Sequence, residues 1–418
     1  SMVRFFKKFV TLFKKLVFIS RIIKLTFYHF YETDKNFNNM KKQKICIIGD
    51  GLSGLTTALA VKSPYLDVDL YYEKNKPKKI DKRITAISDS NFIFLKSLLN
   101  SNSKRLFWTC KKIDLFYENK QQYLNFLNFN GTKNALMHIF ENNKIKNALL
   151  KKIRSKNIKL VSRKISKVNI KDTSITVEKN KIFYDLIIMC LGAHSNLYNE
   201  FDRSRAVKKN YNEIAITGYI KHNLKLDNPK QYFLVEGPLA FLPFKENSFS
   251  YVWSLNKDFF YHNKLNIKTI VEKRIKNLIN KKSKLKLSNI QFYPINLNLP
   301  FTYYKKNTTI LGEGLHSVHP IAGQGFNLVL RDISYLTNLI KKNLSLGLEI
   351  KNSTILNNFM QKRKPENIIL SLGIDVTNNF FKKNKILDPL KNKFLKNISK
   401  FSSLKKISEM ISNKGISI

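Results

Sequence analysis

The sequence is poor in glycine, in cysteine and in acidic residues. Its 418 residues include only 14 glycines, less than half of the share of roughly 7% that is usual in proteins. The three cysteines, Cys46, Cys110 and Cys190, lie far apart, which is typical of a reducing compartment and argues against a disulfide framework. Apolar residues make up 43% of the chain, enough to bury a sizeable core, so wholly disordered and fibrous classes are excluded. The length predicts two or three domains.

Acidic residues are outnumbered by basic ones, 29 to 75, which gives a formal net charge of +46. A charge this basic favours a polyanionic partner, either nucleic acid or an anionic membrane. The excess is spread along the whole chain, and Lys, Asn and Ile are all abundant, so the codon bias of an AT-rich genome explains it as well. Because no nucleic-acid recognition module accompanies the charge, we expect no nucleic-acid partner.

The few glycines are concentrated. Seven of the 14 fall in two short windows, which contain Gly49, Gly51 and Gly54, and then Gly312, Gly314, Gly323 and Gly325. A chain that uses little glycine keeps it where the backbone must come close to something else. The two windows are therefore the first candidates for a binding site.

The first window has the order of a dinucleotide-binding unit. The apolar run 45–48 predicts a buried parallel strand, and G-x-G-x-x-G and a predicted helix follow it. A second predicted strand, 68–72, ends at Glu73, which lies 24 residues after the first glycine. In this order the glycines permit a tight turn and a close pyrophosphate, and the carboxylate binds the ribose hydroxyls. The motif alone does not separate NAD from FAD.

The second window, residues 309–332, reads TILGEGLHSVHPIAGQGFNLVLRD. It predicts a strand that ends at Gly312, a loop, and a helix over about 325–342, whose first N–H groups would face an anion or an electron-rich ring. Glu313, His316 and His319 have a spacing that could suit a metal. Because they lie in a loop rather than on one helix face, and no cysteine is near, we expect no metal site.

Together these stretches resemble the flavin-dependent aromatic hydroxylases, specifically their ubiquinone-biosynthesis branch. The pattern of that branch beside the flavin is GD-x-x-H-x-x-HP-x-x-GQG-x-N-x-x-x-x-D, and the second window follows it closely. Further stretches agree with the branch in the same order: 81–95, a helix over 137–153, 211–215, 233–243, 252–253 and 377–395. The resemblance covers about residues 43–400.

The resemblance implies an α/β fold with a Rossmann-like FAD-binding domain and a mostly antiparallel substrate-domain sheet. The expected parts are a basic amphipathic leader (1–40), a discontinuous FAD-binding domain (41–210 and 301–345), a substrate domain (211–300) and C-terminal helices (346–418). The strand 239–243, with Trp253 nearby, is the expected wall of the substrate pocket.

The resemblance also implies which residues hold FAD. Gly49, Gly51, Gly54 and Glu73 would bind its ADP half, and Arg83 would lie near the flavin. The ribityl chain and ring would be held by residues of the second window, namely Gly312, Glu313, Pro320, Gly323, Gln324, Gly325 and Asn327. No catalytic residue is predicted, because in such enzymes the cofactor carries the difficult step.

The chain departs from the family at several cofactor contacts. The family's aspartate after Gly312 is Glu313 here. The family's DG-x-x-S-x-x-R stretch appears as 191–198, with Leu191 for the Asp and Tyr198 for the Arg. On the 137–153 helix, Asn143 and Lys146 replace an Arg and a Gln. We therefore expect a poor direct reaction with NADPH, and the electron donor stays open between NADPH and a redox protein.

The implied function is that of an FAD-dependent monooxygenase that hydroxylates a polyprenylated phenol in ubiquinone biosynthesis. One alternative is a flavoprotein reductase or oxidase on the same fold. The other is a catalytically impaired partner within a membrane complex of quinone-biosynthesis proteins, which the altered residues Leu191, Asn143 and Lys146 favour.

Each end of the chain contains a basic amphipathic stretch, a pattern that is typical of membrane-surface helices. Residues 1–31 predict a helix with a basic stripe beside Phe, Leu, Ile and Val, without the roughly 20 uncharged apolar residues of a spanning helix. The same pattern is typical of a mitochondrial presequence, and Met40 is a second candidate start. Residues 391–411 form another basic amphipathic stretch, which core packing explains equally well. We expect a peripheral membrane protein, on the cytoplasmic face in a bacterium or the matrix side in a mitochondrion.

Overall fold

The computed structural model describes residues 42–73, 81–99, 101–119, 122–131, 135–156, 158–193, 195–201, 205–224, 226–279, 284–351, 354–382 and 388–398. The predicted leader, 1–40, and the part of the C-terminal stretch after residue 398 lie outside these ranges. None of the helices within them is both long and apolar enough to cross a membrane.

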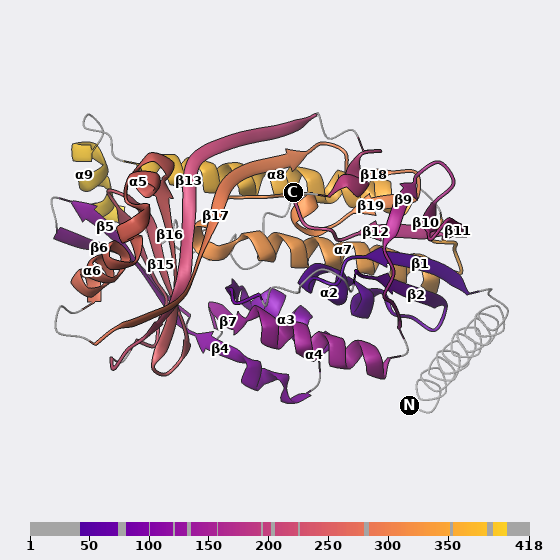
Figure 1. The fold of residues 1–418 in the computed structure, drawn as a ribbon, viewed down its shortest axis with the longest axis horizontal. Coiled ribbons are helices and arrows are strands. Elements are labelled where there is room, and N and C mark those ends of the chain that lie inside the picture. The colour runs from indigo at the N-terminus through magenta and orange to yellow at the C-terminus, as the bar shows by residue number, and fades with distance from the viewer. Residues whose placement is uncertain are drawn as a thin grey trace, which may run out of the picture.

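A six-stranded sheet forms the first layer, at the right of Figure 1. Its order is β18 (Tyr304–Lys305), β19 (Thr308–Ile310), β12 (Leu186–Met189), β1 (Gln43–Ile48), β2 (Leu66–Tyr71) and β8 (Lys159–Val161). All neighbours are parallel except β18 and β19. Ile45, Cys46 and Ile47 are fully buried, as a central parallel strand covered on both faces requires. Helices α2 (Leu52–Val61), α4 (Asn142–Ser155) and α7 (Gly325–Ser345) pack together beside this sheet.

Two small sheets complete this part of the chain. One is β11 (Asn180–Phe183), β10 (Ser174–Val177) and β9 (Ile165–Asn169), and the other is β3 (Ile84–Ile87), β7 (Met137–Glu141) and β4 (Phe107–Cys110). Helix α3 (Asp89–Leu98) follows β3. The helix predicted over 137–153 is wrong in its first five residues, which form β7 because they pair with β3 and β4 on either side. Short 3₁₀ turns are η1 (Ser101–Leu106), η2 (Asn196–Tyr198), η3 (Lys264–Asn266), η4 (Gly312–Gly314) and η5 (Ile321–Gly323).

A seven-stranded sheet stands at the left of Figure 1. Its order is β17 (Lys286–Pro300), β13 (Ala206–Lys221), β16 (Ser248–Asn256), β15 (Gly237–Lys245), β14 (Lys230–Leu234), β5 (Lys112–Asn119) and β6 (Gln122–Asn130). Only the β14–β5 pair is parallel. Helices α5 (Lys257–His262) and α6 (Ile267–Ile279) cover one face. The large sheet thus takes β5 and β6 from the range 41–210, which the sequence assigns to the FAD-binding part.

Two C-terminal helices bridge the layers. Helix α8 (Thr354–Phe381) packs on α7 and runs from the first layer to the large sheet, where α9 (Asp388–Ile398) contacts β6. Figure 1 shows α8 and α3 on opposite sides of α7. These helices therefore connect the glycine-rich windows with the far end of the large sheet.

A buried polar network joins α7 to α8. The Asp332 carboxylate, which is completely buried, lies 2.7 Å from His316 Nε2 and 2.7 Å from Arg363 Nε. It also accepts hydrogen bonds from Asn367, and Arg363 is paired with Glu366 as well. Burial alone would raise the pKa of Asp332, but Arg363 and His316 outweigh it and lower that pKa. The network fixes the rotation of α8 about its own axis and holds the loop that carries His316.

We expect Asp332→Asn to reduce the free energy of unfolding by about 3–5 kcal/mol. The substitution removes a carboxylate that balances the positive charge of the buried Arg363. Urea denaturation followed by circular dichroism would measure the effect. The matched control is Asp67→Asn, which breaks an exposed ion pair with Lys42 and should leave stability nearly unchanged. Equal stability of the two variants would contradict the role given to Asp332.

Candidate functional site

One large cavity, of about 2580 Å³, lies between the first layer and the large sheet. A pocket for a single drug-sized ligand has about 300–1000 Å³, so this cavity has room for a dinucleotide and a second ligand. Of the residues predicted from the sequence, most line it, namely Gly49, Gly51, Glu73, Arg83, Glu313, Pro320, Gly323, Gln324, Gly325 and Asn327. Gly54 and Gly312 lie behind its surface.

The three glycines of the first window have different roles. A Cβ on Gly49, whose φ is +116°, would lie 2.3 Å from the Cys190 carbonyl oxygen. A Cβ on Gly54 would lie 1.9 Å from the Gly49 carbonyl oxygen. Both positions thus need glycine for the protein's own packing. A Cβ on Gly51 would meet nothing within 4 Å, so this glycine leaves space that is open to a ligand, as a pyrophosphate requires.

The start of α2 suits the same ligand. No side chain caps this helix, and Gly51, Leu52 and Ser53 at its start line the cavity. N–H groups at such a start attract an anion. The Lys146 ammonium lies 3.3 Å from Asp50 of the same turn. Lys146, which sequence comparison marks as a departure, therefore offsets the negative charge of Asp50 beside the phosphate position.

Asn143 is the other departure on α4. Asn143 does not line the cavity, whereas Asn142 does. Asn142 is buried, accepts a hydrogen bond from the Thr85 hydroxyl and donates one to Asp81. It shares a helix face with Lys146, four residues later. Asn143 therefore gives no reason to expect a weakened cofactor site.

Asn327 holds the second window in place. Its side-chain oxygen accepts hydrogen bonds from the Ser88 backbone and the Asn91 side chain, and its nitrogen donates to the carbonyls of Ala86 and Gly323. The bonds with Ala86, Ser88 and Asn91 tie the start of α7 to the β3–α3 turn. Since the four bonds use the full hydrogen-bonding capacity of the amide, Asn327 shapes the site through the backbone that it fixes.

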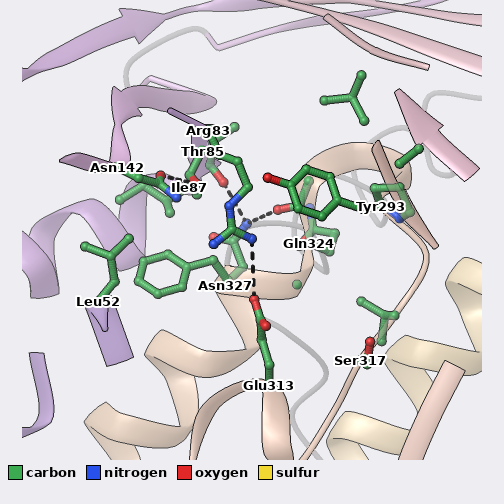
Figure 2. Close-up of a pocket in the computed structure, with 18 of the residues that line it drawn as sticks. Leu52, Arg83, Thr85, Ile87, Asn142, Tyr293, Glu313, Ser317, Gln324 and Asn327 are labelled. Carbon is green, nitrogen blue, oxygen red and sulfur yellow. Dashed lines mark hydrogen bonds and ion pairs between the residues drawn. The ribbon is translucent and has the colours of Figure 1, made fainter. Parts of the chain in front are cut away.

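Arg83 lies at the centre of the cavity wall, as Figure 2 shows. Its guanidinium forms two hydrogen bonds of 2.9 Å with Asp81. It also approaches Glu313 at 3.9 Å and lies 5.8 Å from the centre of the Tyr293 ring. The carboxylate of Glu313, one methylene longer than the family's aspartate, is thus engaged by Arg83. This arrangement places one guanidinium and two carboxylates on the cavity wall, beside the position where the resemblance predicts the flavin.

Tyr198 faces away from the cavity. It is buried, and its hydroxyl donates to the Gly192 carbonyl and accepts from the Leu191 backbone N–H. Leu191, Gly192 and Ser195 line the cavity, but Tyr198 does not. Tyr198 thus stabilises the turn, and of the two altered positions in this stretch only Leu191 can contact a ligand directly.

The two histidines of the second window have carboxylate partners. His316 binds Asp332, and His319 Nε2 lies 2.7 Å from Glu213 on β13. Glu213 also pairs at 2.7 Å with Lys382, which is the first residue after the end of α8. Within the described ranges, no group of three or more His, Cys, Asp or Glu side chains could hold a metal. The histidines thus connect the second window to β13 and to the C-terminal helices.

The wall on the large sheet includes the predicted strand 239–243 but not the predicted neighbour Trp253. Ala240 and Leu242 line the cavity, but Trp253 is fully buried in the core beneath α5 and α6. Its strand neighbour Val252 faces the cavity instead, because successive side chains of a strand point to opposite faces. The polar lining residues that sequence reasoning missed come from β13, β14 and β17, namely Thr217, Gln231, Tyr293 and Asn296. Strand alternation is the signal that could have found them.

Comparison with known proteins agrees with this geometry. Residues 256–408 match the family model for squalene epoxidase. The mitochondrial ubiquinone biosynthesis monooxygenase of Dictyostelium discoideum is 25% identical over 65% of this chain and 67% of its own. The 3-demethoxyubiquinol 3-hydroxylase of Escherichia coli is 27% identical over 41% of this chain and 43% of its own. Among solved structures, p-nitrophenol 4-monooxygenase of Pseudomonas putida superimposes with a TM-score of 0.74, at 11% identity, over 90% of this chain and all of that chain.

The fold is that of the FAD-dependent aromatic monooxygenases, which confirms the predicted fold class. By sequence, the chain is a homologue of the ubiquinone-biosynthesis monooxygenases within that class, as its motifs predict.

Glu213 should make the junction of β13, α8 and the second window sensitive to acid. Burial alone would raise its pKa, but hydrogen bonds from His319 and Lys382 lower that pKa to about 2 from an ordinary 4.5. Because the pKa is lower in the folded chain, the stabilisation is complete above about pH 4.5 and is lost as the pH falls towards 2. At about 1.4 kcal/mol per pKa unit, it amounts to about 3 kcal/mol.

The measurement is the free energy of unfolding in urea between pH 7 and the lowest pH at which the protein stays folded. Glu213→Gln should be less stable than the wild type at neutral pH, and the difference should shrink as the pH falls below about 4.5. Glu246→Gln, at an exposed glutamate, is the control. A constant difference across this range would show that the Glu213 charge contributes nothing.

Proposed function

We propose that this protein is an FAD-dependent monooxygenase that hydroxylates a polyprenylated phenol in ubiquinone biosynthesis. The observation that carries the proposal is a single cavity with a phosphate cradle at one end, at Gly51, and a wall of the large sheet at the other. The chain is homologous to proteins named for ubiquinone biosynthesis, which supports the choice of substrate.

The residues present fit FAD. The open space at Gly51, the uncapped start of α2 and Glu73 at the end of β2 would hold its ADP half. Glu313, Pro320 and the loop 323–325 would hold the ribityl chain and the ring, and Arg83 would lie beside it. When bound and reduced, FAD supplies the oxygen-transfer chemistry.

The role of the protein in the reaction is to position the aromatic ring of the substrate and to exclude water. Ala240, Leu242 and Val252 give an apolar surface against which an aromatic ring can lie. Thr217, Gln231 and Tyr293 offer hydrogen-bonding groups at the same wall, which can fix the direction of a phenol oxygen. An apolar wall with few polar groups is the usual form of a small-molecule site, and the homology to monooxygenases favours a hydroxylase over a reductase or oxidase.

The alternative of an impaired partner loses support. It depended on altered cofactor contacts, and of the altered residues Asn143 and Tyr198 do not line the cavity. Lys146 offsets the Asp50 carboxylate at the phosphate turn, which reduces the repulsion between that carboxylate and an anionic ligand. Leu191 is left as the one altered position of that stretch that faces the cavity, and it bears on the electron donor, NADPH or a redox protein.

Several relatives are named as mitochondrial proteins. For this chain we propose a peripheral position on an anionic membrane surface, with other quinone-biosynthesis proteins as partners. A polyprenylated phenol resides in lipid, and the net charge of +46 favours an anionic surface.

Purified protein should be yellow, and Gly51→Val should lose the bound flavin while keeping its fold. The valine Cβ meets no protein atom, so it would occupy only the space of the pyrophosphate. Absorbance at the flavin maximum and thermal melting would measure the two effects. Gly54→Ala is the contrasting variant, because its methyl group clashes with Gly49 and should destabilise the fold itself. A colourless wild type after incubation with FAD would refute the proposal.

NADPH should bleach the bound flavin slowly, whereas dithionite should bleach it at once. The reason is Leu191, which supplies no charge at the position where the family has an aspartate. Anaerobic stopped-flow absorbance would compare the wild type with Leu191→Asp, which should react faster. Fast and saturable bleaching of the wild type would show that the altered residue does not matter.

A further inference from the structure

From Arg363 onwards, helix α8 carries its polar and apolar residues on the opposite faces from those expected at a protein surface. Its buried side chains include Arg363, Glu366, Asn367, Ser371 and Asn378. Its exposed side chains include large apolar ones at a spacing of three and four residues, namely Ile369, Leu372, Val376 and Phe380. A helix beside water normally shows the reverse arrangement.

The inverted orientation is fixed by the fold. Arg363 and Asn367 bind the buried Asp332 on α7, and Asn378 donates to Glu213 on β13. Rotating α8 to bury the apolar residues would break these bonds and leave charges buried without partners, which is costly. The apolar side chains therefore stay exposed over about 16 Å of helix, at 1.5 Å per residue.

The apolar face continues onto α9 and opens into the cavity. Phe394 of α9 is 47% exposed, and its ring centre lies 6.1 Å from that of Phe380. Val376, Phe380 and Phe394 are exposed and also line the cavity. We define the α8–α9 face as Ile369, Leu372, Val376, Phe380 and Phe394.

Behind this face one part of the cavity lining is apolar, and we call this part the apolar arm. The arm is lined by side chains of β5, β6, β14, α8 and α9, namely Leu115, Phe126, Leu127, Phe233, Phe381 and Leu395. The rings of Phe233 and Phe381 stack at 3.6 Å between centres. Since none of these side chains carries a polar group, the arm suits a hydrocarbon chain rather than the head of a substrate.

The charges around the face are positive. Lys393 and Lys396 are exposed near it, while the other charges nearby are paired, Lys382 with Glu213, Asp375 with Lys209 and Asp388 with Lys391. An exposed apolar stripe bordered by lysines is the pattern of a helix that lies in the interface of an anionic membrane.

We propose that the α8–α9 face docks on an anionic lipid leaflet, and that the apolar arm takes the isoprenoid tail of the substrate directly from that leaflet. The docking depends on the described surface alone, whereas the identity of the tail rests on the proposed function. Substrate would then reach the ring-binding wall without its tail crossing water.

A fluorescent label tests the docking in the full chain. The native cysteines Cys46, Cys110 and Cys190 are all buried, so an added surface cysteine can be labelled selectively. Val376→Cys carries an environment-sensitive dye, and Ile93→Cys on α3 is the control. The two side chains are 66% and 61% exposed, on helices at opposite sides of α7. Each protein is mixed with vesicles of phosphatidylcholine, with or without phosphatidylglycerol.

We expect a blue shift of the dye at position 376 with anionic vesicles, a smaller one with neutral vesicles, and none at position 93. Absence of a shift at position 376 would overturn the proposal, whether or not the protein sediments with the vesicles through another segment. An equal shift at both positions would also overturn it. A shift at position 376 that grows with protein concentration without vesicles would assign the face to a second copy of the chain instead.

Kinetics test the uptake of the tail. Leu372→Glu changes the face but not the cavity lining, and Ile93→Glu is its control. For a long-tailed phenol in anionic vesicles, Leu372→Glu should lower kcat/KM at least about tenfold, because a buried leucine contact with lipid is lost. For a soluble phenol without the tail, it should leave kcat/KM unchanged. An equal loss on both substrates, or none on either, would overturn the proposal. If the wild type turns over neither phenol, the proposed function fails, and the label still decides the docking.

Discussion

The buried carboxylate of Asp332 is the interaction on which much of this structure depends. It binds His316 from the second glycine window and Arg363 and Asn367 from α8. A carboxylate without water must be paired from several sides, and here the partners come from two separate parts of the chain. As a result, the loop beside the cavity and the orientation of α8 are set by one group.

Some glycines of the site are required by packing within the protein, and another leaves space for a ligand. Gly49 and Gly54 are explained by atoms of the protein, because any side chain there would overlap backbone. Packing does not explain Gly51, because a Cβ there would meet no protein atom within 4 Å. A bound ligand explains it. Gly312, with a φ of +83° and Ser53 Oγ 2.9 Å from its would-be Cβ, belongs with the first kind. A glycine motif therefore indicates a binding site only through those glycines that packing within the protein does not require.

Local order in the sequence was enough to predict the strand, turn and helix around Gly51, and the helix that follows Gly325. It was not enough for β5 and β6, because their place in the large sheet depends on pairing between β5 and β14, more than a hundred residues apart. Side-chain direction was the other gap. Trp253 and Tyr198 were expected at the ligand, but each points into the core, since strand register and a buried turn decide which way a side chain faces.

Cys190 lies directly behind the phosphate turn, where its carbonyl contacts Gly49. Burial raises the pKa of its thiol to about 12, although a hydrogen bond with Thr57 lowers it in part. Only the thiolate reacts readily, and a thiol with a pKa raised this far stays protonated near pH 7. An oxidant such as hydrogen peroxide that escapes from the cavity meets almost no reactive sulfur there. The centre of the first layer is thus chemically resistant to the by-products of oxygen chemistry carried out beside it.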